Sequence, residues 1–226
     1  MTLWGVFNFN SETLEIIGIT LRMSLASTFI ATVLGTILGL LLEKNRFPGK
    51  RVVVRICRTL MGTPSVVAGL VVYLLLMRRG PLGSWGLLFT VRAMVIAQVF
   101  LITPIITGMV YTYAARSAPA IRAFAKTMGA DRFQTQLLFV KEMSGEFYFA
   151  VITAFSRAIS EVGAVMIVGG NIQHKTRTMT TAISMLRSMG DFRQGITLGV
   201  LLLIIAFILQ SLSDLLHRGE APQENL

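Results

Sequence analysis

The 226-residue chain is 54% hydrophobic and only 14% charged, whereas a soluble globular domain averages roughly 25% charged residues. Its mean hydropathy of +0.69 therefore predicts an integral membrane protein and argues against a soluble enzyme. The net charge of +10 does not predict nucleic-acid binding, because the basic residues lie between long apolar runs, where they normally set membrane topology.

Five apolar runs are each long enough to cross a membrane as a helix, which needs about 20 residues. Helices are expected because every backbone group must find its partner within the span. The sequence thus predicts one all-α transmembrane domain over residues 1–226. Its five spans are expected near residues 15–42, 52–77, 93–114, 147–169 and 195–216.

The first span carries small residues every four positions, at Ala31, Gly35 and Gly39. This spacing lets two helix backbones approach closely. It is compatible with packing inside one chain, which we favour, or with a subunit interface.

The second span contains the sequence GTPSVVAGL (62–70), in which Pro64 removes a helical hydrogen bond and bends the chain. The sequence LITPIITG (101–108) repeats this feature in the third span. The hydroxyls of Thr63 and Ser65 at the first bend are compatible with a polar transport path or with an ordinary kinked bundle.

The loop between the third and fourth spans, residues 117–142, predicts two short helices. Pro119 suits the first turn of one helix, and Gly129 suits its end. Asp131 begins a second helix, with Gln134 completing a capping box. Phe133, Leu137 and Leu138 are expected to share a face. The loop is either a docking element or an amphipathic hairpin on the membrane surface.

The fourth span carries Arg157 and Glu161 within RAISEVGAVMIVGG (157–170). Charges at membrane depth are costly unless they are paired or hydrated. Residues four apart on a helix can meet on one face. We favour a structural ion pair that braces this helix against its neighbours, with a place for Glu161 in the transport path as the alternative.

Hydrogen-bond donors cluster around and after this pair. Hydroxyls and backbone amides bind an oxyanion without adding negative charge, although Asn and Thr also cap helices and form turns routinely. Both interpretations stay open for the outer residues. The residues expected along a transport path are Thr63, Pro64, Ser65, Ser160, Glu161, Asn171, Thr180 and Thr181.

The two sides of the membrane differ in their lysine and arginine content. The richer side contains the basic residues of 44–58 and 116–141 together with Arg218, and the richer side is normally cytoplasmic. The N-terminus is therefore expected outside and the C-terminus inside. His174 and His217 lie far apart and the chain has one cysteine, so no metal site is expected.

The loop 117–142 resembles the EAA loop of ABC-transporter permeases, with Ala125, Gly129 and Phe139 in register. Ala123 stands where that family has Glu, and Lys141-Glu142 replaces its Leu-Pro. The segments GTPSVVAGL, RRGPLG, LLFT, SEVGAVMIVGGNI and TRTMTTAI resemble the tungstate-type branch of the molybdate/tungstate permeases, over residues 14–212.

This resemblance implies a type I ABC importer permease core that works as a homodimer in a bacterial or archaeal cytoplasmic membrane. A separate ATPase subunit would bind ATP and Mg, and an extracytoplasmic binding protein would deliver the oxyanion. The chain has no phosphate-binding loop of its own and is expected to have no catalytic residue. The residues expected to couple it to the ATPase are Ala123, Ala125, Gly129, Ala130, Asp131 and Phe139.

The expected function is import of a tetrahedral oxyanion, tungstate first, with molybdate as the alternative and sulfate or phosphate behind it. A secondary transporter that uses Glu161 as a proton site is a different class of explanation. Five spans without an inverted repeat argue against it. A membrane-embedded hydrolase would need a nucleophile with a base, and no span holds a histidine or paired carboxylates.

Overall fold

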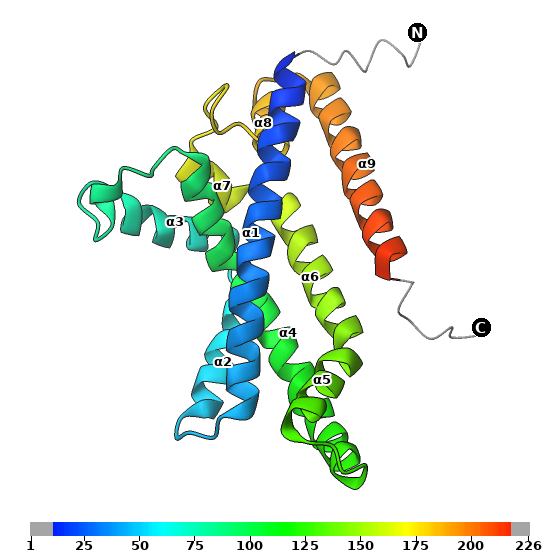
Figure 1. Ribbon diagram of the computed structural model, residues 1–226. Coiled ribbons are helices and arrows are strands. Elements are labelled where there is room, and N and C mark those ends of the chain that lie inside the picture. The colour runs from blue at the N-terminus through cyan, green and yellow to red at the C-terminus, as the bar shows by residue number, and fades with distance from the viewer. Residues whose placement is uncertain (1–10, 218–226) are drawn as a thin grey trace.

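The computed structural model describes residues 11–217, and within them every regular element is helical (Figure 1). The elements are α1 (Ser11–Lys44), α2 (Lys50–Met61), α3 (Ser65–Leu76), the short 3-10 helix η2 (Gly83–Trp85), α4 (Val91–Thr127), α5 (Arg132–Glu142), α6 (Ser144–Ile159), α7 (Gly163–Gly169), α8 (Met179–Ser188) and α9 (Phe192–His217).

Three helices, α1, α4 and α9, are each long and apolar enough to cross a membrane. The predicted second and fourth spans are instead bent pairs, α2 with α3 at 107° and α6 with α7 at 56°. The described residues therefore provide up to five crossings, if each bent pair counts as one. The sequence predicted a bend at Pro64, but not a second break at residues 160–162.

The break between α2 and α3 follows from local sequence. Pro64 lies at the N-cap of α3 with φ −58° and ψ 132°, in the extended region, and it has no N–H to continue the ladder of α2. Because α2 cannot continue past Gly62, the chain starts a new helix at Ser65 in a different direction (Figure 1).

The small residues of α1 allow it to pack closely on α4. A Cβ built on Gly35 would lie 2.7 Å from Cβ of Ile106, and one on Gly39 would lie 2.8 Å from Cγ1 of Val110. The spacing of Ala31, Gly35 and Gly39 thus serves contact within the chain, which confirms the favoured interpretation.

Helix α4 is longer than predicted, because it continues through Pro104 and Pro119 to Thr127. The expectation that Pro119 begins a separate helix is wrong. Proline leaves the carbonyl four residues earlier without its helical donor, and for Pro119 this is the carbonyl of the exposed Ala115. Its neighbour Ala118 is fully buried against Phe139 and Met143, so tertiary packing holds the helix together there.

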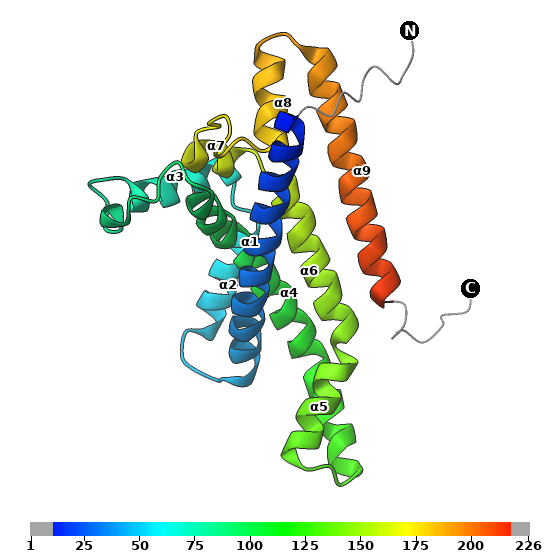
Figure 2. The same cartoon turned by 45° about the horizontal axis from the view of Figure 1, so that its top comes forward.

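The two ends of the molecule are built differently. The start of α1, helix α8 and the start of α9 lie together at one end, here termed the α8 end, and α5 projects with the last turns of α4 at the other (Figures 1 and 2). Glu12 of α1 pairs with Arg177 at 2.9 Å, and Glu15 contacts His174 at 2.6 Å. These bonds tie the connection between α7 and α8 to α1.

Candidate translocation and coupling sites

The two helix breaks meet inside the molecule. A Cβ built on Gly163, at the start of α7, would lie 2.7 Å from Oγ of Ser65, at the start of α3. One turn further along α3, a Cβ on Gly69 would lie 2.6 Å from Cα of Ala164. The predicted path segments 63–65 and 160–161 are thereby brought side by side.

Glu161 lies at this junction and is only 2% exposed. Its Oε2 lies 3.6 Å from Nη2 of Arg157, and its Oε1 accepts a hydrogen bond from the backbone N–H of Ala164 at 3.1 Å. The predicted ion pair therefore forms, and the carboxylate also caps α7. Arg157 is 42% exposed, so its guanidinium offsets the buried negative charge and still faces outward.

A backbone carbonyl, rather than the ion pair, links this junction to another helix. Thr180 of α8 donates a hydrogen bond to the carbonyl of Glu161 at 2.8 Å. Among the described residues, the ion pair and the side-chain hydrogen bond of Arg157 and Glu161 stay within residues 157–164. The expected brace between helices thus uses the backbone of Glu161, not its carboxylate.

Gln98 of α4 is a second link that the sequence analysis did not single out. It is fully buried, accepts from Oγ of Ser27 at 2.5 Å and donates to the carbonyl of Ala158 at 2.7 Å. Ala158 lies in the last turn of α6, where carbonyls lose their helical donors. The signal was present as one amide side chain in the apolar run VIAQVF, which in lipid needs a partner.

The outer hydroxyls are used within the chain. Thr178 and Thr181 form a capping box at the start of α8, and both are fully buried. Ser160 donates to the carbonyls of Ser156 and Arg157 at the end of α6. Asn171 adopts φ 51° in the turn beyond the far end of α7. Capping and turn formation, one of the two interpretations left open, describes these contacts, and a place in the transport path remains a prediction.

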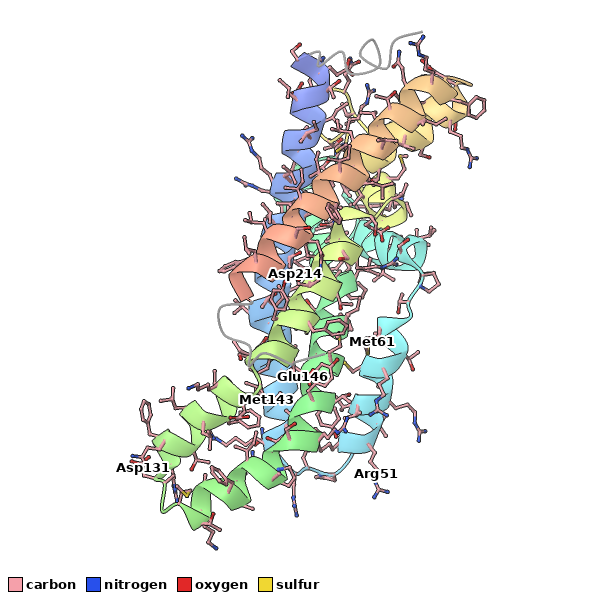
Figure 3. All side chains as sticks on the ribbon, turned by 90° about the vertical axis from the view of Figure 1, so that its right-hand side faces the viewer. Arg51, Met61, Asp131, Met143, Glu146 and Asp214 are labelled. Carbon is pink, nitrogen blue, oxygen red and sulfur yellow. The ribbon has the colours of Figure 1, made fainter. Side chains whose placement is uncertain are left out.

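At the opposite end, α4 and α5 form a helical hairpin whose turn matches the sequence expectation. Gly129 has φ 69°, a conformation that L side chains rarely adopt. Asp131 and Gln134 form the predicted capping box, and Figure 3 shows Asp131 at the tip of the hairpin.

The residues in register with the EAA pattern mostly shape this hairpin. Ala125 and Phe139 are 1% and 6% exposed, and the carbonyl of Ala125 accepts from the N–H of Ala130 at 3.0 Å. Ala123 and Asp131 are exposed. Ala125, Gly129 and Phe139 thus set the hairpin's geometry, and other side chains form its outer surface.

That surface exposes several large apolar side chains. Phe133 is 76% exposed and Leu137 61%, whereas Leu138, expected on the same face, is partly buried. Exposed apolar patches on a surface mark interaction sites. We term the group the hairpin patch; its members are Phe124, Met128, Phe133, Leu137 and Val140.

Charged contacts fix the base of the hairpin to α1 and α2. Arg122 of α4 binds Glu43 of α1 at 2.8 Å. Lys50, the first residue of α2, donates to the carbonyls of Glu43 and Asn45 at 3.1 Å each and lies over the ring of Tyr111 at 5.5 Å. Cations at a helix C-terminus are favourable, so this cluster holds three helices together where the hairpin leaves the bundle.

The fold and these sites define a multi-pass membrane protein with an internal junction of broken helices and, at one end, a helical hairpin that exposes apolar side chains. Residues 31–220 match the family described as binding-protein-dependent transport system inner membrane component. The chain belongs to this family and is an inner membrane component of such a transport system.

Relatives and solved structures agree with this assignment. The chain is 43% identical over 204 residues to the tungstate uptake system permease protein of Peptoclostridium acidaminophilum, covering 90% of each chain. It is 35% identical over 216 residues to the tungstate uptake system permease protein of Campylobacter jejuni, covering 96% of this chain and 90% of that one. Its fold resembles a chain of the MetNI methionine ABC transporter in inward-facing conformations, with a TM-score of 0.76, 19% identity, and coverage of 93% and 97%.

Proposed function

We propose that this chain is the membrane-spanning permease subunit of an ATP-driven ABC importer for tungstate. The observation that carries the proposal is the 43% identity to a tungstate uptake permease over 90% of both chains. An extracytoplasmic binding protein delivers the oxyanion to a homodimer of this chain. The N-terminus faces outward, and the hairpin faces the cytoplasm.

The hairpin patch is the surface that receives the ATPase subunit, which binds ATP and Mg. Phe133 and Leu137 lie one turn apart on α5, and Phe124 in the last turn of α4 lies one turn before the C-cap residue Met128, so each side of the hairpin presents apolar side chains to the partner. The anchor between Arg122 and Glu43 passes movement of the hairpin to α1.

The oxyanion passes the junction of the broken helices. Thr63 and Ser65 supply hydroxyls there and residues 160–161 supply backbone groups, and Arg157 offsets the charge of Glu161, which would otherwise repel a dianion. The engagement of both Glu161 oxygens, one by Arg157 and one by Ala164, favours this role over a proton-coupling site.

Uptake of radiolabelled or mass-detected tungstate, molybdate, sulfate and phosphate into proteoliposomes tests the proposal. Vesicles hold this chain with its ATPase, and the binding protein and ATP are each added or omitted. Uptake that requires both the binding protein and ATP, and that is faster for tungstate than for the other anions, supports the proposal. Uptake driven by a proton gradient with this chain alone would refute it and assign Glu161 to coupling.

A further inference from the structure

A pocket of about 790 Å³ lies between α1, the η2 connection and the start of α4. It is separate from the junction of broken helices and from the hairpin patch. Its wall combines apolar and cationic groups. The residues that matter here are Arg22, Ala26, Trp85, Arg92, Val95 and Ile96.

The two arginines of this pocket have no protein partner in residues 11–217. Both are exposed, and no hydrogen bond or ion pair joins either guanidinium to another residue of that range. Residues 1–10 contain no Asp or Glu. Two cations on one pocket therefore lack a carboxylate from residues 1–217, although Glu12, Glu15 and Glu43 of α1 all find basic partners.

The lengths of the uncharged runs that follow Arg22 in α1 and Arg92 in α4 indicate where these arginines lie relative to the membrane. Arg22 and Glu43 bracket the uncharged residues 23–42 of α1, which span about 30 Å at about 1.5 Å per residue. Arg92 and Arg116 similarly bracket residues 93–115 of α4. A hydrocarbon core is about 30 Å thick, so both pocket arginines lie at one membrane–water interface, on the α8 end. Trp85, which is 62% exposed, lies beside them, as expected for an interfacial aromatic residue.

We propose that this pocket binds an anionic phospholipid of the leaflet at the α8 end. The lipid phosphate lies against Arg22 and Arg92, since guanidinium groups bind phosphate oxygens in a bidentate manner. An acyl chain follows the apolar wall of Ala26, Val95 and Ile96 below them. A free oxyanion has no apolar part that could bury against Ala26, Val95 and Ile96, whereas an acyl chain does. The structure therefore favours a lipid as the occupant.

Lipid binding to the purified protein tests this site without any transport measurement. Native mass spectrometry of the delipidated permease, titrated with phosphatidylglycerol or phosphatidylcholine, gives the affinity for each. Arg22→Gln and Arg92→Gln are each expected to weaken phosphatidylglycerol binding about fivefold, since one basic residue at an anionic lipid surface contributes on the order of that factor. The control Arg79→Gln removes an exposed arginine of the same connection that does not line the pocket, and its affinity should equal that of the parent chain.

A second variant tests the apolar wall with both charges in place. Ala26→Trp fills the pocket next to Arg22 and is expected to reduce binding of phosphatidylglycerol, while binding of glycerol 3-phosphate and inorganic phosphate stays negligible in all variants. Unchanged lipid affinity in both arginine variants overturns the proposal. So does phosphate or tungstate binding as tight as the lipid, which would make this a free-anion site. Loss of binding-protein docking with intact lipid affinity would assign the arginines to that partner instead.

Discussion

At the scale of single residues, two deeply buried polar groups of the bundle, Gln98 and Glu161, have specific partners. Gln98 is fully buried and forms hydrogen bonds with Ser27 and with the carbonyl of Ala158. One carboxylate oxygen of Glu161 pairs with Arg157, and the other accepts a hydrogen bond from the N–H of Ala164. The sequence analysis found the charged pair because its spacing on a helix is local information. It missed Gln98, since the partners of that side chain lie 71 and 60 residues away.

We expect Gln98→Leu to lower the stability of the detergent-solubilised protein by about 1 kcal/mol or more, because it removes the buried hydrogen bonds from the Ser27 hydroxyl and to the Ala158 carbonyl that link α4 to α1 and α6. Thermal melting monitored by tryptophan fluorescence measures the loss. The control Thr153→Val removes a hydroxyl that bonds only within its own helix and should melt near the parent temperature. Equal melting of the two variants would contradict the role of Gln98.

The pair Arg157 and Glu161 predicts an asymmetric mutant cycle. Arg157→Ala leaves a buried carboxylate unpaired, which is strongly unfavourable. Glu161→Gln leaves only the partly exposed guanidinium of Arg157 unpaired. The amide oxygen of the new glutamine can still accept the hydrogen bond from the N–H of Ala164. The first change should therefore destabilise more than the second.

The double variant R157A/E161Q should recover part of the loss caused by Arg157→Ala, as judged from melting temperatures in detergent. Strictly additive losses would show that the two side chains do not interact energetically.

At the scale of elements, local sequence signals located the turns better than the helices between them. The hairpin turn at Gly129 and the capping box of Asp131 were confirmed, because a positive φ and an N-cap are specified by adjacent residues. The uninterrupted α4 was not predicted, since its passage through Pro119 depends on Ala118 packing against Phe139, a tertiary contact. Helix α8 was also missed, although Thr178 carried its capping signal.

Gly129→Val should separate ATPase docking from membrane insertion. Valine at φ 69° is strained by about 1–3 kcal/mol, and the hairpin would relieve this strain by changing its angle. Co-purification with a tagged ATPase subunit should fall several-fold while the yield in the membrane is unchanged.

Gly190 provides a matched control for that variant. It has φ 78°, and like Gly129 it has no neighbour that an added Cβ would meet, but it lies in the turn between α8 and α9 at the other end of the molecule. Gly190→Val should keep the ATPase bound. Equal losses in both variants would mean that backbone strain alone, rather than hairpin geometry, explains the effect.

At the scale of the whole molecule, composition and hydropathy were sufficient to predict a helical membrane protein, and the family assignment was confirmed. Hydropathy gave the positions of the apolar runs but did not show whether each run forms one straight helix or a bent pair. The 107° bend lies at Pro64, which the sequence marked. The 56° bend lies where α7 meets α3 through Gly69 and Gly163, and a contact between distant segments leaves no periodic signal in either one.

The proposed orientation predicts opposite labelling of two exposed glutamines, one from each end of the molecule. With Cys57 replaced by Ser, a cysteine at Gln173, between α7 and α8, should react with a membrane-impermeant maleimide in intact cells. A cysteine at Gln136 of α5 should react only after the membrane is opened. The reverse pattern would invert the topology and place the hairpin outside.

The continuity of α4 has a mechanical consequence. A single helix of 37 residues carries Gln98 at the junction and Thr127 at the hairpin, about 44 Å apart along its axis. A tilt of about 5° around Gln98 would carry the hairpin through about 4 Å, so the arm converts displacement at one end into small rotation at the other. Conversely, a partner that shifts the tip by a few ångströms would rotate α4 by only a few degrees where Gln98 holds the end of α6. In the proposed importer, that geometry would couple the hairpin to the junction through small angular changes at a hydrogen-bonded pivot.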